Sequence, residues 1–183
     1  MQADFLYLPP LFACAFVLAA AWIDCRERRI PNRLVLAGLC VAFAARSLVD
    51  GWGGLGSALG GLAVGLALLV PIYAVGGMGA GDAKLMGMVG AFLGPWGVLS
   101  AAVLTFLSGG VLAVAVALRN RSLGRTLGNT KAMLLGSLVG VVALRKAELA
   151  VPAGGSGTLP YGVAIAVGTL LYVALASMGV EVL

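Results

Sequence analysis

Two of the seven acidic residues lie where an apolar run meets a polar segment, and these two could do chemistry. Asp24 directly follows Ala21-Trp22-Ile23 and opens an arginine-rich segment, whereas Asp82 follows the glycine-rich residues 76–81 and precedes another apolar run. Ionisable groups at the edge of a membrane are costly and are therefore functional candidates. The other acidic residues are most simply interpreted as solvated charges: Asp4, Glu27, Asp50, Glu148 and Glu181.

Two carboxyl groups held close together can share one proton. The ionised group can then activate water as a general base, while the protonated group donates a hydrogen bond to the carbonyl of the peptide bond that is cut. The chain has no histidine, which excludes Ser–His and Cys–His catalysis and imidazole metal sites. Peptide hydrolysis by an aspartic mechanism, with no metal and no cofactor, is the hydrolytic mechanism that this composition permits.

Each aspartate also has a simpler explanation when it is taken alone. Asp24 could be an interfacial charge that pairs with a neighbouring arginine, and Asp82 could be the N-cap of a helix that begins at Ala83. A cap does not require four glycines in the six preceding residues, and glycine permits close approach of another chain segment. A phosphate-binding loop is a poor interpretation, because no Gly-Lys-Ser/Thr follows and Asp82 would repel the anion.

The composition predicts a membrane protein. Of the 183 residues, 61% are hydrophobic and 10% are charged, whereas about 25% are charged in a soluble domain. The net charge of +5 is gathered in short runs between apolar segments, unlike the single basic face of a nucleic-acid-binding protein. Cys14, Cys25 and Cys40 lack CxxC spacing, so buried free cysteines rather than disulfides are expected.

Six apolar segments are candidates for crossing a bilayer, which requires about 20 residues. The positive-inside rule places the arginines after the first segment, and the basic connection 119–158, in the cytoplasm. We expect an all-α polytopic bundle of six transmembrane helices, with both termini outside, in one membrane-embedded domain over residues 1–183. The six segments are Leu8–Ile23, Leu34–Val49, Leu55–Val75, Lys84–Gly94, Trp96–Leu118 and Leu159–Met178.

Three details of this topology can be compared with a structure. The apolar stretch 132–144 is too short to span and is expected to be interfacial or re-entrant. Arg46, near the far end of the second span, is expected to reach toward the interface. Glycines four residues apart, such as Gly61 and Gly65 or Gly90 and Gly94, predict close helix packing rather than chemistry.

The two aspartate motifs resemble those of the type IV prepilin peptidases. Gly79-Ala80-Gly81-Asp82 resembles the GxGD signature of membrane aspartic proteases, and the trailing Lys84 is typical of prepilin peptidases. Asp24, followed by Ile30-Pro31-Asn32, resembles the first motif of that family. Leu159-Pro160-Tyr161-Gly162 is similar to the start of the last helix in the short members, which process Flp-type pilins.

The resemblance implies an endopeptidase of the inner membrane that removes the short basic leader of prepilins at the cytoplasmic face. Asp24 and Asp82 would be the catalytic pair. Lys84 matches the motif without a role that follows from the sequence, and an interfacial charge facing lipid phosphate is its simpler interpretation. The expected partners are a membrane-anchored prepilin and the lipid bilayer, with no nucleic acid and no indicated oligomeric state. The residues that support the motifs are Gly79, Gly81, Lys84, Pro31 and Asn32.

Two alternatives stay open. Archaeal-type preflagellin peptidases share both aspartates. A non-enzymatic transporter or assembly scaffold would instead use paired acids as an ion path, which predicts acids near the bilayer midplane in more than one span; the third, fifth and sixth spans contain none. Methyl transfer to the new pilin terminus is not expected, because the chain lacks the paired cysteines of the longer relatives.

Overall fold

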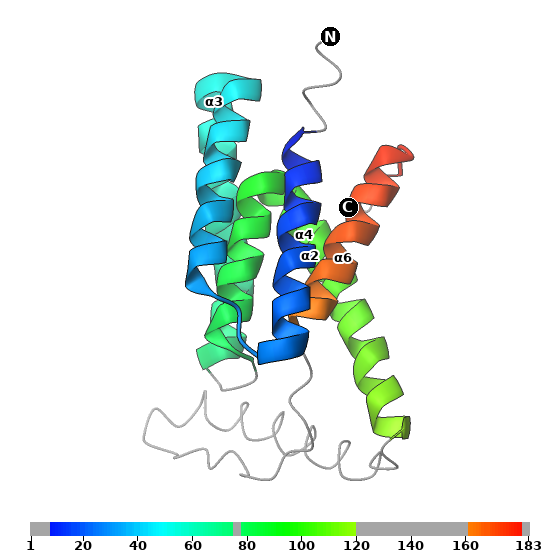
Figure 1. Ribbon diagram of the computed structural model, residues 1–183. Helices are drawn as coiled ribbons and strands as arrows, with labels where there is room; N and C mark the ends of the chain where they lie inside the picture. Colours follow the sequence, from blue (N-terminus) through cyan, green and yellow to red (C-terminus); the bar gives the residue numbers. More distant parts are fainter. Residues whose placement is uncertain (1–7, 75–77, 120–160, 181–183) are drawn as a thin grey trace, which may run out of the picture. The chain divides into compact units, whose positions relative to one another are not determined.

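The computed structural model describes residues 8–74, 78–119 and 161–180, and within them every regular element is an α-helix. The helices are α2 (Leu8–Glu27), α3 (Asn32–Ala74), α4 (Ala80–Arg119) and α6 (Tyr161–Ser177) (Figure 1). The predicted all-α class is confirmed. The expected helix at 132–144 lies outside the described residues.

Three of these helices are long and apolar enough to cross a membrane: Leu8–Glu27, Asn32–Ala74 and Ala80–Ala115. The apolar α6 is shorter, with 17 residues. The described part of the chain thus has four helices rather than six, because two pairs of the expected spans fall within α3 and α4. The two longest helices are each interrupted by a residue with non-helical backbone angles: Gly51 in α3 and Gly94 in α4.

The interruption at Gly51 reverses the direction of α3. Gly51 has a φ of 57°, which favours a residue without a Cβ atom. Beyond it, Gly61 contacts the backbone of Gly90, and Gly65 contacts that of Met86, so the second part of α3 runs antiparallel to the start of α4. The doubling back is visible in Figure 1.

Arg46 binds the backbone beside the interruption of α4. Gly94 has a φ of 79° and precedes Pro95, which has no N–H to donate to the preceding turn. The Arg46 Nε donates a hydrogen bond of 2.8 Å to the carbonyl of Phe92. The Arg46 side chain was expected to reach toward the membrane interface. It is instead only 17% exposed, because it binds the Phe92 carbonyl.

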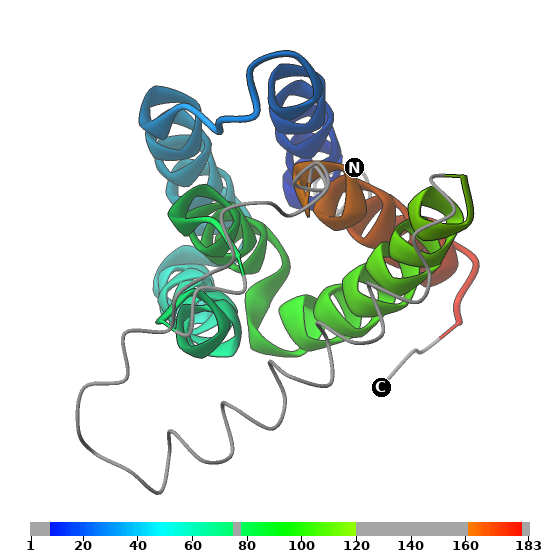
Figure 2. The same ribbon diagram turned by 90° about the horizontal axis from the view of Figure 1, so that it is seen from below.

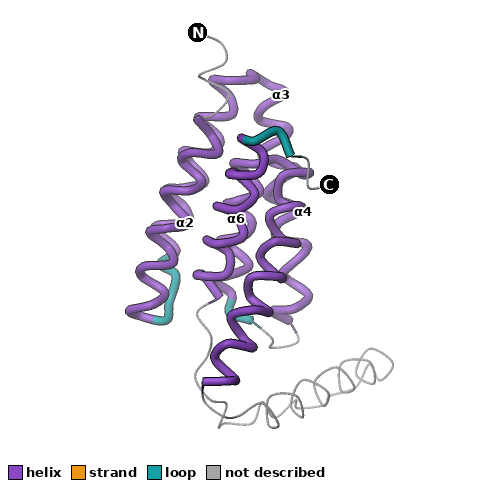
Figure 3. The backbone as a smooth tube through the Cα atoms, turned by 90° about the vertical axis from the view of Figure 1, so that its right-hand side faces the viewer, coloured by secondary structure: helices purple, strands orange, loops and turns teal. Residues whose placement is uncertain are grey.

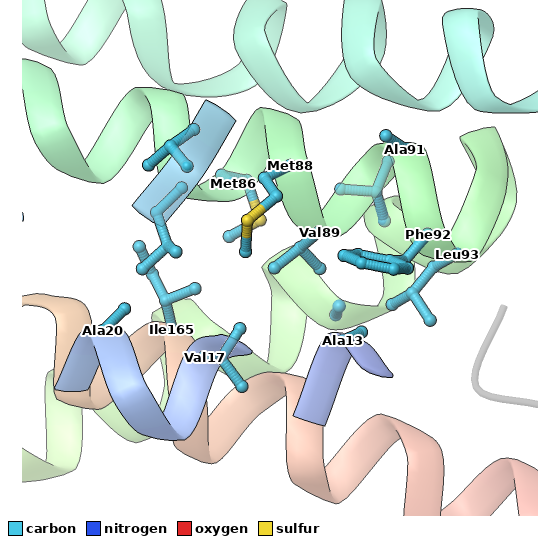
Figure 4. Packing of buried hydrophobic residues seen from close by; sticks show 14 of the residues in the cluster. Ala13, Val17, Ala20, Met86, Met88, Val89, Ala91, Phe92, Leu93 and Ile165 are labelled. Atoms are coloured by element: carbon cyan, nitrogen blue, oxygen red, sulfur yellow. The ribbon is translucent and has the colours of Figure 1, made fainter. Parts of the chain in front are cut away.

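The first half of α4 is the centre of the core. Every residue from Leu85 to Gly94 is buried, so this half has neighbours on all sides. Phe92 stacks on Phe16 of α2 with a ring-centroid distance of 5.9 Å. Figure 4 shows the packing around it, with Ala13, Val17 and Ala20 of α2, Ile165 of α6, and Met86, Met88 and Val89 of α4.

The N-terminal helix α2 packs against two other helices besides α4. It contacts both α3 and α6 (Figure 2), and α2 and α6 lie side by side (Figure 3). All three cysteines are free, but the expectation that they are buried is wrong: Cys25 and Cys40 are exposed, because these helix faces have no neighbour among the described residues, and Cys14 is partly exposed.

The chain divides into two compact units. The first, Met1–Gly109 with Pro160–Leu183, contains both aspartates. Of the second, Gly110–Leu159, the structure describes only the end of α4 as far as Arg119.

Candidate active site

Asp24 lies in the last turn of α2 with its carboxyl group turned into the protein. It is 7% exposed and belongs to the same buried stripe as Ala13, Val17 and Ala20, at helical spacing. Its Oδ2 accepts a hydrogen bond of 3.0 Å from the backbone N–H of Gly162. This burial argues against the simpler explanation of Asp24 as an interfacial charge, since such a charge would point to solvent.

Asp82 lies in the first turn of α4 and is half-buried. Its Oδ2 accepts a hydrogen bond of 3.1 Å from the N–H of Gly79, and its own N–H donates to the Gly79 carbonyl, also at 3.1 Å. A side chain at the third helical position that reaches back to the cap residue stabilises a helix start. Asp82 therefore does serve the helix terminus, but Gly79 occupies the cap position.

The two aspartates face the same region of the molecule. Asp24 lies in the last turn of α2, and Asp82 in the first turn of α4. The loop before Asp82 also packs against the segment that follows α2, because a Cβ atom at Gly81 would lie 3.1 Å from the Cβ of Ile30. Glycine at 81 thus permits the close approach of a second segment beside the carboxyl group.

The supporting residues of the two motifs are also in contact. Lys84 Nζ donates a hydrogen bond of 3.1 Å to Oδ1 of Asn32, and both residues are exposed. The Pro31 carbonyl accepts hydrogen bonds from the N–H groups of Leu34 and Val35, at 3.1 and 3.4 Å, and so begins α3. The structure therefore brings Asn32 to Lys84, while Pro31 fixes the start of the helix.

Positive charge gathers at this end of α2. Arg28 has a φ of 51°, which ends the helix, while its N–H still donates to the Asp24 carbonyl at 2.9 Å. The guanidinium of Arg26 lies 4.5 Å from the centre of the Trp22 ring, a favourable cation–π distance. Among the described residues, no three Cys, Asp or Glu side chains are grouped so as to hold a metal ion.

Sequence reasoning gave no role to Gly162, although it contacts Asp24 directly. Gly162 belongs to Leu159-Pro160-Tyr161-Gly162, a segment that the sequence marks only as the start of a helix. Nothing in local spacing indicates that this glycine, 138 positions away, meets Asp24.

Comparison with known proteins identifies one family. A sequence model of the type IV leader peptidase family matches residues 11–114. The match covers more than half of the chain and includes both aspartates, but it ends before α6. No curated protein and no solved structure matches the chain.

Proposed function

Since the chain belongs to the type IV leader peptidase family and has apolar helices that can span a membrane, we propose that it cleaves the leader from Flp-type prepilins by aspartic catalysis. Membership of this family makes the protein a membrane protease. The proposal adds the catalytic residues, Asp24 and Asp82, the class of substrate, and the cytoplasmic face of the inner membrane as the place of cleavage.

One observation supports the catalytic pair above all: the segment that leaves the buried Asp24 packs, through Ile30, against Gly81, the residue directly before Asp82. Each carboxyl group accepts a glycine N–H through Oδ2. Two such groups can work as one acid and one base.

The reaction follows from that division of roles. The ionised carboxylate removes a proton from water, and the water oxygen bonds to the carbonyl carbon of the scissile peptide, whose oxygen accepts a hydrogen bond from the protonated carboxyl. The tetrahedral species then breaks at the C–N bond, and a proton passes to the leaving nitrogen. The products are the leader, with a new carboxylate, and the mature pilin, with a new amine.

We also propose the six-span topology, with both termini outside and residues 1–183 as one peptidase domain. The interruptions at Gly51 and Gly94 would be turns at the outer face, and the exposed arginines between α2 and α3 would lie in the cytoplasm. The helix that carries Asp82 begins at Ala80, four residues before the expected span Lys84–Gly94. This extension lengthens the shortest of the six proposed spans.

Co-expression with a Flp-type prepilin tests the proposed function, with leader removal followed by mobility on a gel. Asp24→Asn and Asp82→Asn should each abolish processing at equal protein levels. The matched control is Asp50→Asn, an exposed carboxylate at the opposite end of the helices, which should process normally. Normal processing by either of the first two variants would refute the catalytic pair.

Two further versions of the assay test the catalytic mechanism and the choice of substrate. Processing should continue in a chelator, because two carboxyl groups need no metal for this reaction; its loss would contradict an aspartic mechanism. A preflagellin offered in place of the prepilin tests the alternative substrate, and preferential cleavage of the preflagellin would replace the pilin assignment.

A further inference from the structure

Position 162, at the start of α6, is occupied by a glycine that touches Asp24 and lies outside the matched family region. We propose that Gly162 is a positioning residue for catalysis: its backbone N–H and its lack of a side chain together hold the Asp24 carboxyl group in place. This inference rests on the proposed function, in which Asp24 is catalytic.

The contact at position 162 is specific to Asp24. A Cβ atom added there would lie 2.8 Å from Oδ2, 3.1 Å from Cβ and 3.2 Å from Cγ of Asp24, and these are its three nearest neighbours. The backbone N–H of the same glycine donates to the same Oδ2 at 3.0 Å. The first N–H groups of a helix have no partner inside the helix, so this donor is available to an outside carboxyl group.

Neither partner can easily move away to make room for a side chain. Asp24 is buried on the stripe of α2 that packs into the core. The start of α6 is tied to α4, because Ser108 Oγ donates a hydrogen bond of 3.2 Å to the carbonyl of Ala164, two residues after the contact. A methyl group at 162 therefore displaces the carboxyl group itself, and a shift of about 1 Å in a catalytic group can cost roughly 100-fold in rate.

The first experiment compares two glycines of α6 in the full-length chain, with a Flp-type prepilin as the substrate. Gly162→Ala should lower kcat by about 10- to 100-fold while KM stays within about twofold, because only the catalytic group is displaced. The control is Gly168→Ala, whose Cβ would meet Thr105 of α4 rather than Asp24; it should reduce stability and leave kcat per folded molecule unchanged.

The outcomes separate this inference from the proposed function. If Gly162→Ala keeps normal kcat while Asp24→Asn and Asp82→Asn are inactive, the positioning role is wrong and the peptidase proposal stands. If the two asparagine variants are active, the peptidase proposal fails and the positioning role falls with it.

A second experiment measures the contact without activity. Thermal unfolding in detergent should show that Gly162→Ala lowers the melting temperature more in the unmodified chain than in an Asp24→Ala background, where Oδ2 and Cγ are absent. An equal decrease in both backgrounds would contradict the contact. If Gly162→Ala does not fold, recovery of folded protein in the double variant supports the proposal, and failure to recover it overturns the proposal.

Discussion

The Nζ of Lys84 lies 3.1 Å from Oδ1 of Asn32, and this hydrogen bond joins the two aspartate motifs across 52 positions of the sequence. Lys84 stands two residues after Asp82, and Asn32 begins α3 just after the segment that leaves Asp24. The bond therefore ties together the two segments that carry the carboxyl groups. A role as a lipid-facing charge does not account for this specific partner.

Loss of the Lys84–Asn32 bond should slow cleavage without stopping it. Lys84→Met removes the donor, and because both side chains are exposed we expect a decrease of only about two- to fivefold in the initial rate of leader removal. Asn32→Asp keeps an acceptor oxygen for Lys84 and should retain activity. A Lys84→Met variant as fast as the unmodified chain would show that the bond has no part in positioning.

The contact between Gly61 and Gly90 should be intolerant of any side chain. A Cβ atom on either glycine would meet the carbonyl oxygen of the other, so Gly61→Ala or Gly90→Ala should destabilise the protein by about 1–3 kcal/mol. Gly53→Ala, which has nothing within 4 Å of the added Cβ, is the matched control. Thermal unfolding in detergent measures both, and equal melting temperatures for the variants and the control would contradict the close approach.

The hydrogen bond from Arg46 to the Phe92 carbonyl should contribute more to stability than the ion pair of Arg46 with Asp50. Arg46→Met leaves the Phe92 carbonyl without this donor, which should cost about 1–3 kcal/mol. Asp50→Asn removes only the partly exposed 3.5 Å pair with Arg46 and should cost less than about 1 kcal/mol. If chemical unfolding shows the larger loss for Asp50→Asn, the ion pair rather than the backbone bond stabilises this region.

The proposed topology can be tested by labelling cysteines with a membrane-impermeant maleimide. Cys25 is exposed and adjoins Asp24; with Cys14 and Cys40 replaced by alanine, it should react only after the membrane is opened. Trp52 is 89% exposed beside the Gly51 interruption. A variant with Trp52→Cys, in which Cys14, Cys25 and Cys40 are replaced by alanine, should react in intact cells. Reaction of both positions from one side would refute the six-span arrangement.

The sequence predicted the helical class, because apolar runs bounded by charged segments carry that information locally. It also indicated breaks near Asp50 and Pro95, since one apolar segment ends and the next begins at each of these positions. It did not predict that Gly162 meets Asp24 or that Arg46 turns to Phe92, because each contact joins helices that are distant in the chain. The catalytic roles of Asp24 and Asp82 stay a prediction.

The touching backbones of Gly61 and Gly90 also fix the register of α3 against α4. A slide along the helix axis would bring a neighbouring side chain, such as that of Leu62 or Val89, into a space that admits only hydrogen atoms. Asp82 lies on the same uninterrupted stretch of α4 as Gly90, so this contact also fixes the position of Asp82 along α3. Axial sliding of α3 along α4 is therefore closed as a way of making room beside Asp82.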